Sequence, residues 1–261
     1  MTALRGPIRV VEAEALGYKR TWRGTMISSF VNPILFLGAM GLGLGTLVDA
    51  NTDVGISYLT FVATGLLAAS GMQNGAVDGS FPVMAGIKWR KSYDGMISTP
   101  VSPADIVHGR FIWSTLRLTF VLTVFAIIAV LFGAMELGPA LLAVPPGVLT
   151  GLAFASAITA WTVTLEDDTS LSTLFRFAIV PLFLFSGTFF PISELPDFLQ
   201  AVAYVTPLFH GVELVRKVAL PGAGAELVTA IPIWVHVGYL TVMTVVGVVL
   251  AARLLDRRLK P

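Results

Sequence analysis

Long uncharged stretches alternate with short charged ones along the whole chain. Six of these stretches approach the length of about 20 predominantly apolar residues that a membrane-spanning helix needs. The sequence therefore predicts six spans, at residues 25–48, 57–80, 108–133, 140–164, 173–190 and 229–252. A soluble protein with a large buried core does not account for six such stretches in a chain of 261 residues.

The composition agrees with this pattern. Only 13% of the residues are charged and 55% are hydrophobic, whereas a soluble domain carries about 25% charged residues. The expected fold class is an all-α polytopic membrane protein, with residues 1–261 forming a single domain. The net charge of +1 gives no sign of a nucleic-acid partner, and the lack of cysteine excludes disulfides and thiolate metal sites.

Lysine and arginine residues are distributed unevenly between the two sides of the predicted spans. Cytoplasmic loops carry an excess of these residues. Fourteen of the 17 lie at the termini or in the loops after spans two and four, and only Arg216 and Lys217 lie on the other side. Arg117 lies about two turns inside the third span, from which it can snorkel to the interface. Both termini are therefore expected in the cytoplasm.

An acidic trio, Glu166, Asp167 and Asp168, follows the fourth span. Acidic residues count little in the charge rule, so the trio is compatible with a cytoplasmic loop. Asp168 or Thr169 is expected to cap the following helix, because carboxylates are favourable near a helix N-terminus. A proton relay is the alternative, and it is disfavoured because the trio lies in a loop.

The segment before the first span, residues 7–24, has an amphipathic pattern. Its apolar and aromatic positions recur at helical spacing, at Ile8, Val11, Ala15, Tyr18 and Trp22. Basic residues fall largely on the rest of the helix surface. This pattern predicts a helix in the membrane interface, which is contacted by lipid. The alternative is that the basic residues only set the orientation of the first span.

A second amphipathic segment, residues 87–98, lies between spans two and three. Its apolar positions are Trp89, Tyr93, Met96 and Ile97, and its charged positions are Lys88, Arg90, Lys91 and Asp94. Pro100 and Pro103 follow, and a proline disfavours the helical conformation at the residue before it. The pattern predicts a short helix with a sharp end. Periodicity alone leaves two roles open: a membrane-surface helix or a docking helix for a soluble partner.

The sequence lacks the motifs of several kinds of catalytic and binding site. There is no GxxxxGK[ST] phosphate loop, so this chain is not expected to bind ATP in the P-loop manner. Without HExxH or GxSxG, we assign no catalytic, cofactor-binding or metal-binding residue. His108, His210 and His236 are scattered along the chain. For His236, inside the last span, a neutral side chain bonded to a neighbouring helix is favoured over a functional ionisable group.

Carrier chemistry is also disfavoured. No acidic residue is expected deep within a span, which argues against a carrier coupled to protons or sodium ions.

The stretch between spans five and six, residues 192–218, is too polar for a span and too apolar for a free loop. Prolines divide it into two helix-length pieces, about 197–205 and 208–218. One side of the first piece is apolar, at Leu195, Phe198, Leu199, Val202 and Val205. Such pieces suit re-entrant helices that are buried in protein or line a cavity. The candidate gate residues are Phe190, Pro191, Leu195, Pro196, Phe198, Pro207 and His210.

Three strings carry a resemblance to a known family. FLFSGTFFPISELPDFLQAVAYVTPLFHGVELVR, GLAFASAITAW and GLGLGTL resemble ABC-2 type transporter permeases, including nodulation-factor (lipo-oligosaccharide) export permeases and daunorubicin-type drug-efflux permeases. The likeness covers nearly the whole chain. It implies an interface helix at 7–24, a cytoplasmic coupling helix at 87–98 and two external re-entrant helices at 192–218. It also implies that spans one, two and five line the path of the cargo.

The resemblance further implies a function and partners. The expected function is the permease subunit of an exporter in the bacterial cytoplasmic membrane that moves an amphipathic or hydrophobic compound outward. Two separate ATPase subunits would supply ATP and magnesium chemistry, and a second permease copy or a homologous permease would complete the path. The alternatives are a membrane scaffold or accessory subunit without transport activity, and a channel that works without ATP.

Overall fold

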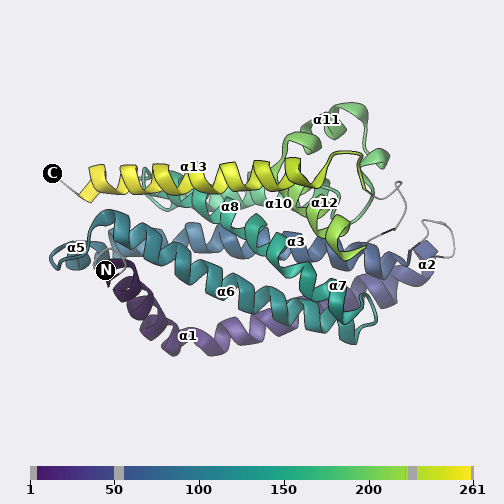
Figure 1. Ribbon diagram of the computed structural model, residues 1–261, viewed down its shortest axis with the longest axis horizontal. Coiled ribbons are helices and arrows are strands. Elements are labelled where there is room, and N and C mark those ends of the chain that lie inside the picture. The colour runs from purple at the N-terminus through teal and green to yellow at the C-terminus, as the bar shows by residue number, and fades with distance from the viewer. Residues whose placement is uncertain (1–4, 50–55, 221, 223–227, 260–261) are drawn as a thin grey trace.

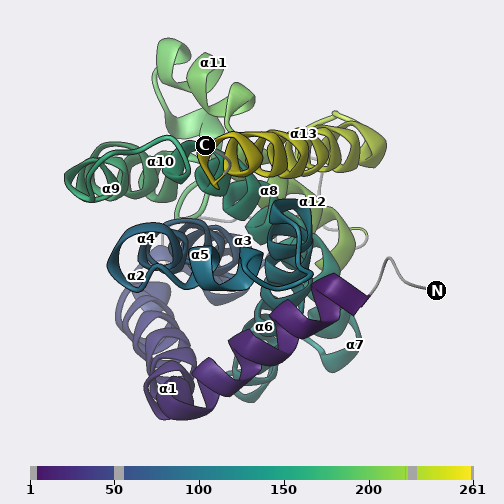
Figure 2. The ribbon, with the colours of Figure 1, turned by 90° about the vertical axis from the view of Figure 1, so that its left-hand side faces the viewer.

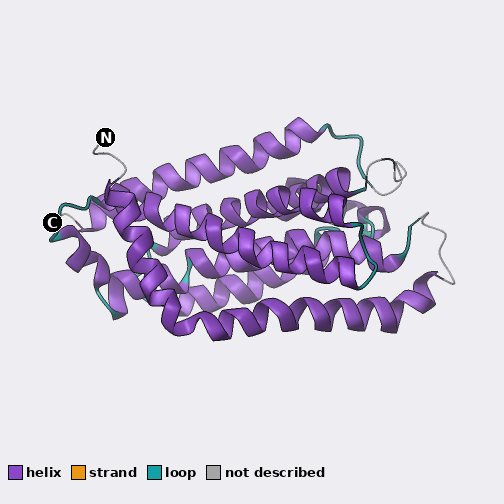
Figure 3. Cartoon of the chain, turned by 60° about the horizontal axis from the view of Figure 1, so that its bottom comes forward, coloured by secondary structure: helices purple, strands orange, loops and turns teal. Residues whose placement is uncertain are grey.

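The chain is helical throughout the part that the structure describes. The computed structural model describes residues 5–49, 56–220, 222 and 228–259, and these contain no strand (Figures 1 and 3). The helices along the first half of the chain are α1 (Arg5–Leu37), η1 (Gly38–Leu44), α2 (Gly45–Asp49), α3 (Tyr58–Gly79), α4 (Phe81–Met84), η2 (Ala85–Trp89), α5 (Ser92–Ile97) and α6 (Pro103–Leu131). Those along the second half are α7 (Leu137–Leu142), α8 (Val144–Thr162), α9 (Thr169–Leu174), η3 (Phe175–Ile179), α10 (Val180–Phe185), η4 (Ile192–Glu194), α11 (Asp197–Val205), α12 (Pro207–Ala219) and α13 (Ile233–Leu259).

The bundle has two distinct ends. Both termini and α5 lie at one end, which we call the terminal end, and α2, α7 and α11 lie at the other, the distal end (Figure 1). The two amphipathic stretches of the sequence at 7–24 and 87–98 therefore meet at the same end of the molecule. The predicted re-entrant segment lies at the distal end.

The predicted interface helix and first span form one continuous helix. α1 runs from Arg5 to Leu37 and continues through η1 and α2, and it changes direction after crossing α6 (Figure 2). Its start packs against α6, where Val10 is buried and lies against Gly109. The predicted apolar face is turned elsewhere, since Ile8 and Trp22 are exposed.

Four helices in the described part of the chain are long and apolar enough to cross a membrane. They are Gly6–Gly41, Pro103–Leu131, Leu137–Thr162 and Ile233–Leu259. The bent pair α11 and α12, whose axes meet at 81°, adds a fifth if it counts as one span. The predicted count of six is therefore not confirmed. The predicted fifth span is a shorter apolar helix, Thr169–Phe185.

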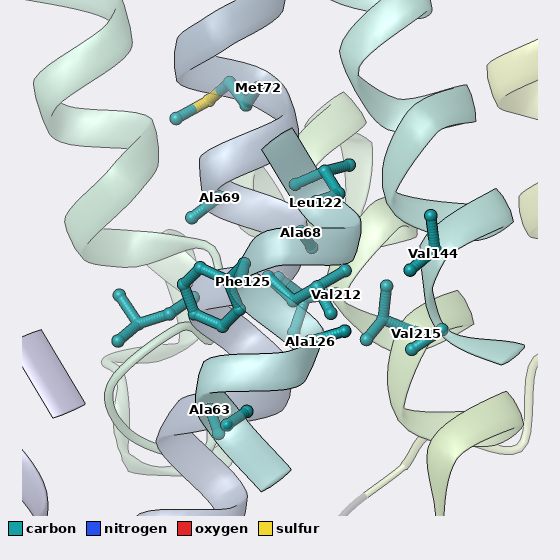
Figure 4. Close-up of a cluster of buried hydrophobic side chains, with 14 of the residues drawn as sticks. Ala63, Ala68, Ala69, Met72, Leu122, Phe125, Ala126, Val144, Val212 and Val215 are labelled. Atoms are coloured by element: carbon teal, nitrogen blue, oxygen red, sulfur yellow. The ribbon is translucent and has the colours of Figure 1, made fainter. Parts of the chain in front are cut away.

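α3, the predicted second span, lies at the centre of the bundle. It is not among the four apolar helices, because Gln73, Asn74 and Asp78 make it more polar. Its neighbours α6, α8 and α12 cover it, and the core between these helices is filled by small and branched side chains (Figure 4). The labelled members of this core are Ala63, Ala68, Ala69, Met72, Leu122, Phe125, Ala126, Val144, Val212 and Val215.

Small residues bring α3 and α8 into backbone contact. Glycines recur every fourth residue on α3, and small residues do so on the facing surface of α8: Gly71, Gly75 and Gly79 against Gly147, Gly151 and Ala155. A methyl group added to any of the three α3 glycines would collide with a backbone oxygen of α8. Such small-xxx-small patterns allow helices to approach closely in membranes, where packing drives association.

Candidate functional site

The α4–α5 segment, residues 81–97, follows α3 at the terminal end. The predicted single helix over 87–98 is wrong, because the structure divides it into η2, which ends at Trp89, and α5, which starts at Ser92. Lys91 between them has φ of +49°. This left-handed conformation does not continue a right-handed helix. The segment therefore changes direction between its two aromatic residues.

The two aromatic residues of the α4–α5 segment differ in exposure. Trp89 is 54% exposed, and its charged neighbours Lys88, Arg90, Lys91 and Asp94 are also exposed. Tyr93 is only 2% exposed, and its ring lies against Gly86. Burial raises the pKa of the Tyr93 phenol above its ordinary value of 10.0, so the group stays neutral. The expectation that Tyr93 offers a surface to a partner is therefore wrong. Met96 and Ile97 are half-buried.

Buried charges connect this end of the bundle across three helices. Arg110 on α6 forms an ion pair with Glu14 on α1, with 2.6 Å between nitrogen and oxygen, and donates to the backbone oxygen of Asp78 at 3.0 Å. Further along α6, Arg117 forms an ion pair with the Asp78 carboxylate at 2.7 Å and donates to the backbone oxygen of Asn74 at 3.2 Å. Asp78 is 8% exposed and lies beside the last residue of α3, so it does not contradict the expectation that no acidic residue lies deep within a span.

The loop with the acidic trio is held by two basic side chains. Lys88 Nζ donates to the backbone oxygen of Glu166, and Arg258 near the end of α13 donates to those of Val163 and Leu165. These bonds tie the α4–α5 segment, the end of α8 and the end of α13 together. The helix cap is shifted from its predicted place: α9 starts at Thr169, and its backbone N–H donates to the Asp167 carboxylate at 3.0 Å, whereas Asp168 makes no side-chain cap bond.

A small cleft with a cavity volume of about 60 Å³ lies between α1, α3, α6 and α10. Its lining combines polar and aromatic side chains: Ser29, Asn32, Pro33, Phe36, Leu66, Ser70, Gln73, Asn74, Val121, Phe125 and Phe183. Parts of the predicted spans one, two and five meet here, together with span three. Seen along the bundle, α1, α3 and α10 lie around one side of the molecule (Figure 2).

The predicted re-entrant segment consists of two short helices at the distal end. α11 and α12 meet at Thr206 and Pro207, close to the predicted bounds of 197–205 and 208–218. The apolar side of α11 does not pack against this chain, since Phe198, Val202 and Val205 are more than half exposed. Among the candidate gate residues, Leu195 and His210 are buried, Phe190, Pro191 and Pro207 are half-buried, and Pro196 is exposed.

Buried polar groups anchor α12. Arg216 donates to the backbone oxygen of Gly187 at 2.7 Å, and its guanidinium lies 3.8 Å from the centre of the Phe61 ring on α3. Glu213 accepts hydrogen bonds from the backbone nitrogen and the hydroxyl of Thr229, both at 2.7 Å. Arg216 is thus a buried link between α12 and α3.

Two histidines that are 26 residues apart meet beside α12. Nδ1 of His210 lies 2.9 Å from Nδ1 of His236 on α13, and the His210 ring stacks on Tyr239 with 4.1 Å between ring centres. The His236 side chain therefore bonds to a neighbouring helix, as favoured from the sequence. The description of the histidines as scattered holds only along the chain. The described residues contain no group of three or more metal-ligating side chains.

Comparison with known proteins identifies the family of this chain. The model of the ABC-2 type transporter family matches residues 8–220. The chain belongs to the ABC-2 type transporter family. It is 30% identical over 257 residues to Nodulation protein J of Rhizobium meliloti (strain 1021), covering 97% of this chain and 94% of that protein. It is 22% identical over 194 residues to the inner membrane transport permease YadH of Escherichia coli (strain K12), covering 74% of each.

Membership of the ABC-2 type transporter family supports several expectations in general form. The chain is a multi-pass membrane-transport component, not itself an enzyme, and the family associates with ABC-type ATPase partners.

Sequence reasoning missed the Asp78–Arg117 pair and the cleft. Both had a signal in the sequence, because Asp78 and Arg117 each lie within a predicted span and Ser70, Gln73 and Asn74 recur at helical spacing.

Proposed function

We propose that this chain is the permease subunit of an ATP-binding-cassette exporter that moves an amphipathic or hydrophobic compound out across the cytoplasmic membrane. The observation that carries the proposal is the match of the ABC-2 type transporter family over residues 8–220, which reach from α1 to the end of α12. The chain has no phosphate-loop sequence. The energy for export therefore comes from a separate ATPase subunit, and two such subunits serve a pair of permeases.

The α4–α5 segment is the proposed docking site for the ATPase. Exposed Trp89 lies there among Lys88, Arg90 and Lys91, and tryptophan is frequent among interface residues that dominate binding energy. Its link to Glu166 and its covalent continuity with α3 allow a displacement of this segment to reach the centre of the bundle. The buried Tyr93 supports the segment from within and does not contact the ATPase.

The proposed membrane arrangement has six spans, formed by α1, α3, α6, α8, the run α9–α10 and α13. An even number of crossings agrees with the position of both termini at one end of the bundle (Figure 1). We assign the terminal end to the cytoplasm, because 14 of the 17 lysine and arginine residues lie in the segments that the sequence places there. The predicted second span is polar but covered by protein, so it need not meet the hydropathy of a lipid-facing helix.

Co-purification tests this proposal, and two exposed tryptophans make a matched pair. Trp89 lies at the terminal end, and Trp234, which is 73% exposed, lies at the start of α13 at the distal end. The tagged full-length chain, extracted from its own membrane into lipid nanodiscs, should bring down a protein with a phosphate loop. Trp89→Ala should weaken that association about 30-fold, which corresponds to about 2 kcal/mol, whereas Trp234→Ala should leave it unchanged.

The outcomes separate the proposal from its alternatives. A chain that integrates into the membrane but never brings down an ATPase would support an accessory subunit or an ATP-independent channel. Equal association of the two tryptophan variants would move the docking site away from the α4–α5 segment while leaving the exporter assignment in place.

A further inference from the structure

Two buried imidazoles join the first turns of α12 and α13. His210 is the fourth residue of α12 and is 6% exposed, and His236 is the fourth residue of α13 and is fully buried. Their Nδ1 atoms lie 2.9 Å apart, which is a hydrogen-bond distance. The pair therefore holds α12 to α13 towards the distal end of the bundle (Figure 1).

The protonation of the two rings decides whether this hydrogen bond can form. A neutral imidazole has one N–H group and one acceptor nitrogen, whereas an imidazolium has two N–H groups and no acceptor. One Nδ1 atom must donate and the other must accept, so at least one of the two rings must be neutral. When both rings are protonated, two N–H groups face each other and the bond is lost.

The position of the rings favours the uncharged form. Both lie in the first turn of a helix, where the helix dipole opposes a positive charge. The Nε2 atom of His236 has no hydrogen-bond partner among the described residues, so a protonated His236 would bury an N–H group without an acceptor. Neither histidine forms an ion pair with a carboxylate in the described part of the chain.

Three charged side chains of α12 lie near the pair, and each is bound to another group. Glu213 accepts two hydrogen bonds from Thr229. Lys217 donates to the backbone oxygen of Thr229 at 2.6 Å, and Arg216 donates to that of Gly187 at 2.7 Å. Two cations and one anion therefore surround the histidines, and the anion is already engaged.

The other helices packed against α12 bring no charge to the pair. α7 and α8 contain no ionisable side chain, and the charged residues of α3 and α13 lie towards the terminal end. Asp197, at the start of α11, is exposed and lies at the opposite end of that helix from α12. Tyr204 of α11 and Tyr239 of α13 are phenols, which stay neutral in acid.

Tyr239 links the histidine pair to α11. Its ring stacks on His210, and its hydroxyl donates to the backbone oxygen of Val205, the last residue of α11, at 2.7 Å. The outer side of α11 is not covered by this chain, since Phe198 and Val202 are more than half exposed. Displacement of the His210 ring therefore also weakens the hold of α13 on α11.

We infer that His210 and His236 form an acid-sensitive latch, which holds α11 and α12 against the start of α13 while one ring is neutral and releases them when both rings are protonated. An imidazole in water has a pKa of about 6.5. The released state binds more protons than the latched state, so the latch holds above that pH and weakens as the pH falls below it. The latch does not depend on the proposed exporter function, which adds only that the distal end faces the outside of the cell.

Distances across the latch test this inference. The chain has no cysteine, so spin labels can be placed at two exposed positions, Val202 on α11 and Val242 on α13. The full-length chain in nanodiscs, without nucleotide, is measured by pulsed electron paramagnetic resonance at about pH 7.5 and about pH 5, on either side of the ordinary imidazole pKa. The distance distribution should shift by several ångströms in acid and return at neutral pH. A control label pair at Leu116 on α6 and Val249 on α13 should not respond.

The chain has three histidines, and exchanges to asparagine assign the acid response. The asparagine amide offers a donor and an acceptor close to the place of Nδ1 and does not titrate. The double variant His210→Asn, His236→Asn should therefore lose the response. Each single variant should lose it as well, because the amide oxygen can accept from the remaining imidazolium. His108→Asn is the matched control and should keep the response, since His108 is exposed near the start of α6.

The single variants keep the test decisive if the double variant does not fold. Loss of the response in a folded single variant, with the response retained in His108→Asn, supports the latch. A wild-type distribution that is the same at both pH values would overturn the inference, and so would a response that survives in the folded single variants. No step of the experiment requires an ATPase, so failure of the exporter assignment would leave the latch standing.

Discussion

α3 and α13 are both long helices of one bundle, yet they differ in polarity and burial. α3 is the more polar and the more buried of the two, whereas α13 is apolar and mostly exposed. In α3, 15 of 22 residues are buried, and the helix carries Gln73, Asn74 and Asp78. In α13, only 5 of 27 residues are buried, and most of the exposed ones are apolar. In a membrane the lipid-facing surface must be apolar, whereas a helix covered by protein can pair its polar groups. Hydropathy therefore reports lipid contact, not burial.

The two helices also differ in the parts of the molecule that they contact. α3 continues into the α4–α5 segment, pairs with Arg117 and lines the cleft, so the proposed docking segment, a buried charge and the cleft meet on one element. α13 contacts this centre chiefly through α8 and α12 and presents the rest of its surface outward. We expect substitutions in α3 to affect folding and transport, and most substitutions in α13 to affect neither.

The largest effect is expected when the charge inside α3 is removed. Asp78→Ala leaves Arg117 buried without its partner, and breaking a buried ion pair in this way costs about 3–5 kcal/mol. The variant should lose most of its folded, monodisperse fraction in detergent, measured by size-exclusion chromatography after heating. The double variant Asp78→Leu, Arg117→Met removes both charges and should recover a large part of that loss. If the double variant is no better than the single one, the pair is not the reason for the polarity of α3.

A smaller effect is expected from single methyl groups at matched glycines. Gly75→Ala places a methyl group against the backbone oxygen of Gly151, and such overpacking costs about 1–3 kcal/mol. Gly238→Ala on α13 meets no atom within 4 Å and should be neutral or slightly stabilising. The two variants are compared by thermal inactivation of the purified chain. Equal behaviour would mean that the α3–α8 contact is looser than described.

The smallest effect is expected on the outward surface of α13. Val242 is 62% exposed there, so Val242→Ala removes contacts with lipid and none with a buried protein core. The stability in nanodiscs should change by less than about 0.5 kcal/mol. A loss comparable to that of Gly75→Ala would show that this face of α13 is covered by another protein chain.

Much of the fold could be predicted from the sequence, wherever one local signal was enough. The apolar runs predicted α6 and α13, and the prolines predicted the division of residues 192–218 into α11 and α12. Such signals depend only on neighbouring residues. They also predicted a helix at 57–80, close to the bounds of α3, but not that other helices of the bundle cover it, because a polar helix has the same sequence whether it is covered or not.

The site was harder to predict because it depends on contacts between distant residues. Helical periodicity places Tyr93 on the same side as Trp89, but the left-handed Lys91 interrupts the period and turns Tyr93 inward. His210 and His236 are separated by a segment whose path the sequence does not specify. The glycine pattern GMQNGAVDG, by contrast, was present in the sequence and could have predicted the close packing of α3.

The central claim is that a nucleotide-driven movement of the α4–α5 segment reaches the cleft through α3. The chain has no cysteine, so spin labels can be placed at Leu35 on α1 and Leu184 on α10, which are exposed next to the cleft residues Phe36 and Phe183. Labelled chains are diluted with unlabelled ones in the complex with the ATPase, and distances are measured by pulsed electron paramagnetic resonance. We predict that ATP shifts the distance distribution by several ångströms in the wild type and not in Trp89→Ala. Identical distributions with and without nucleotide would contradict the account.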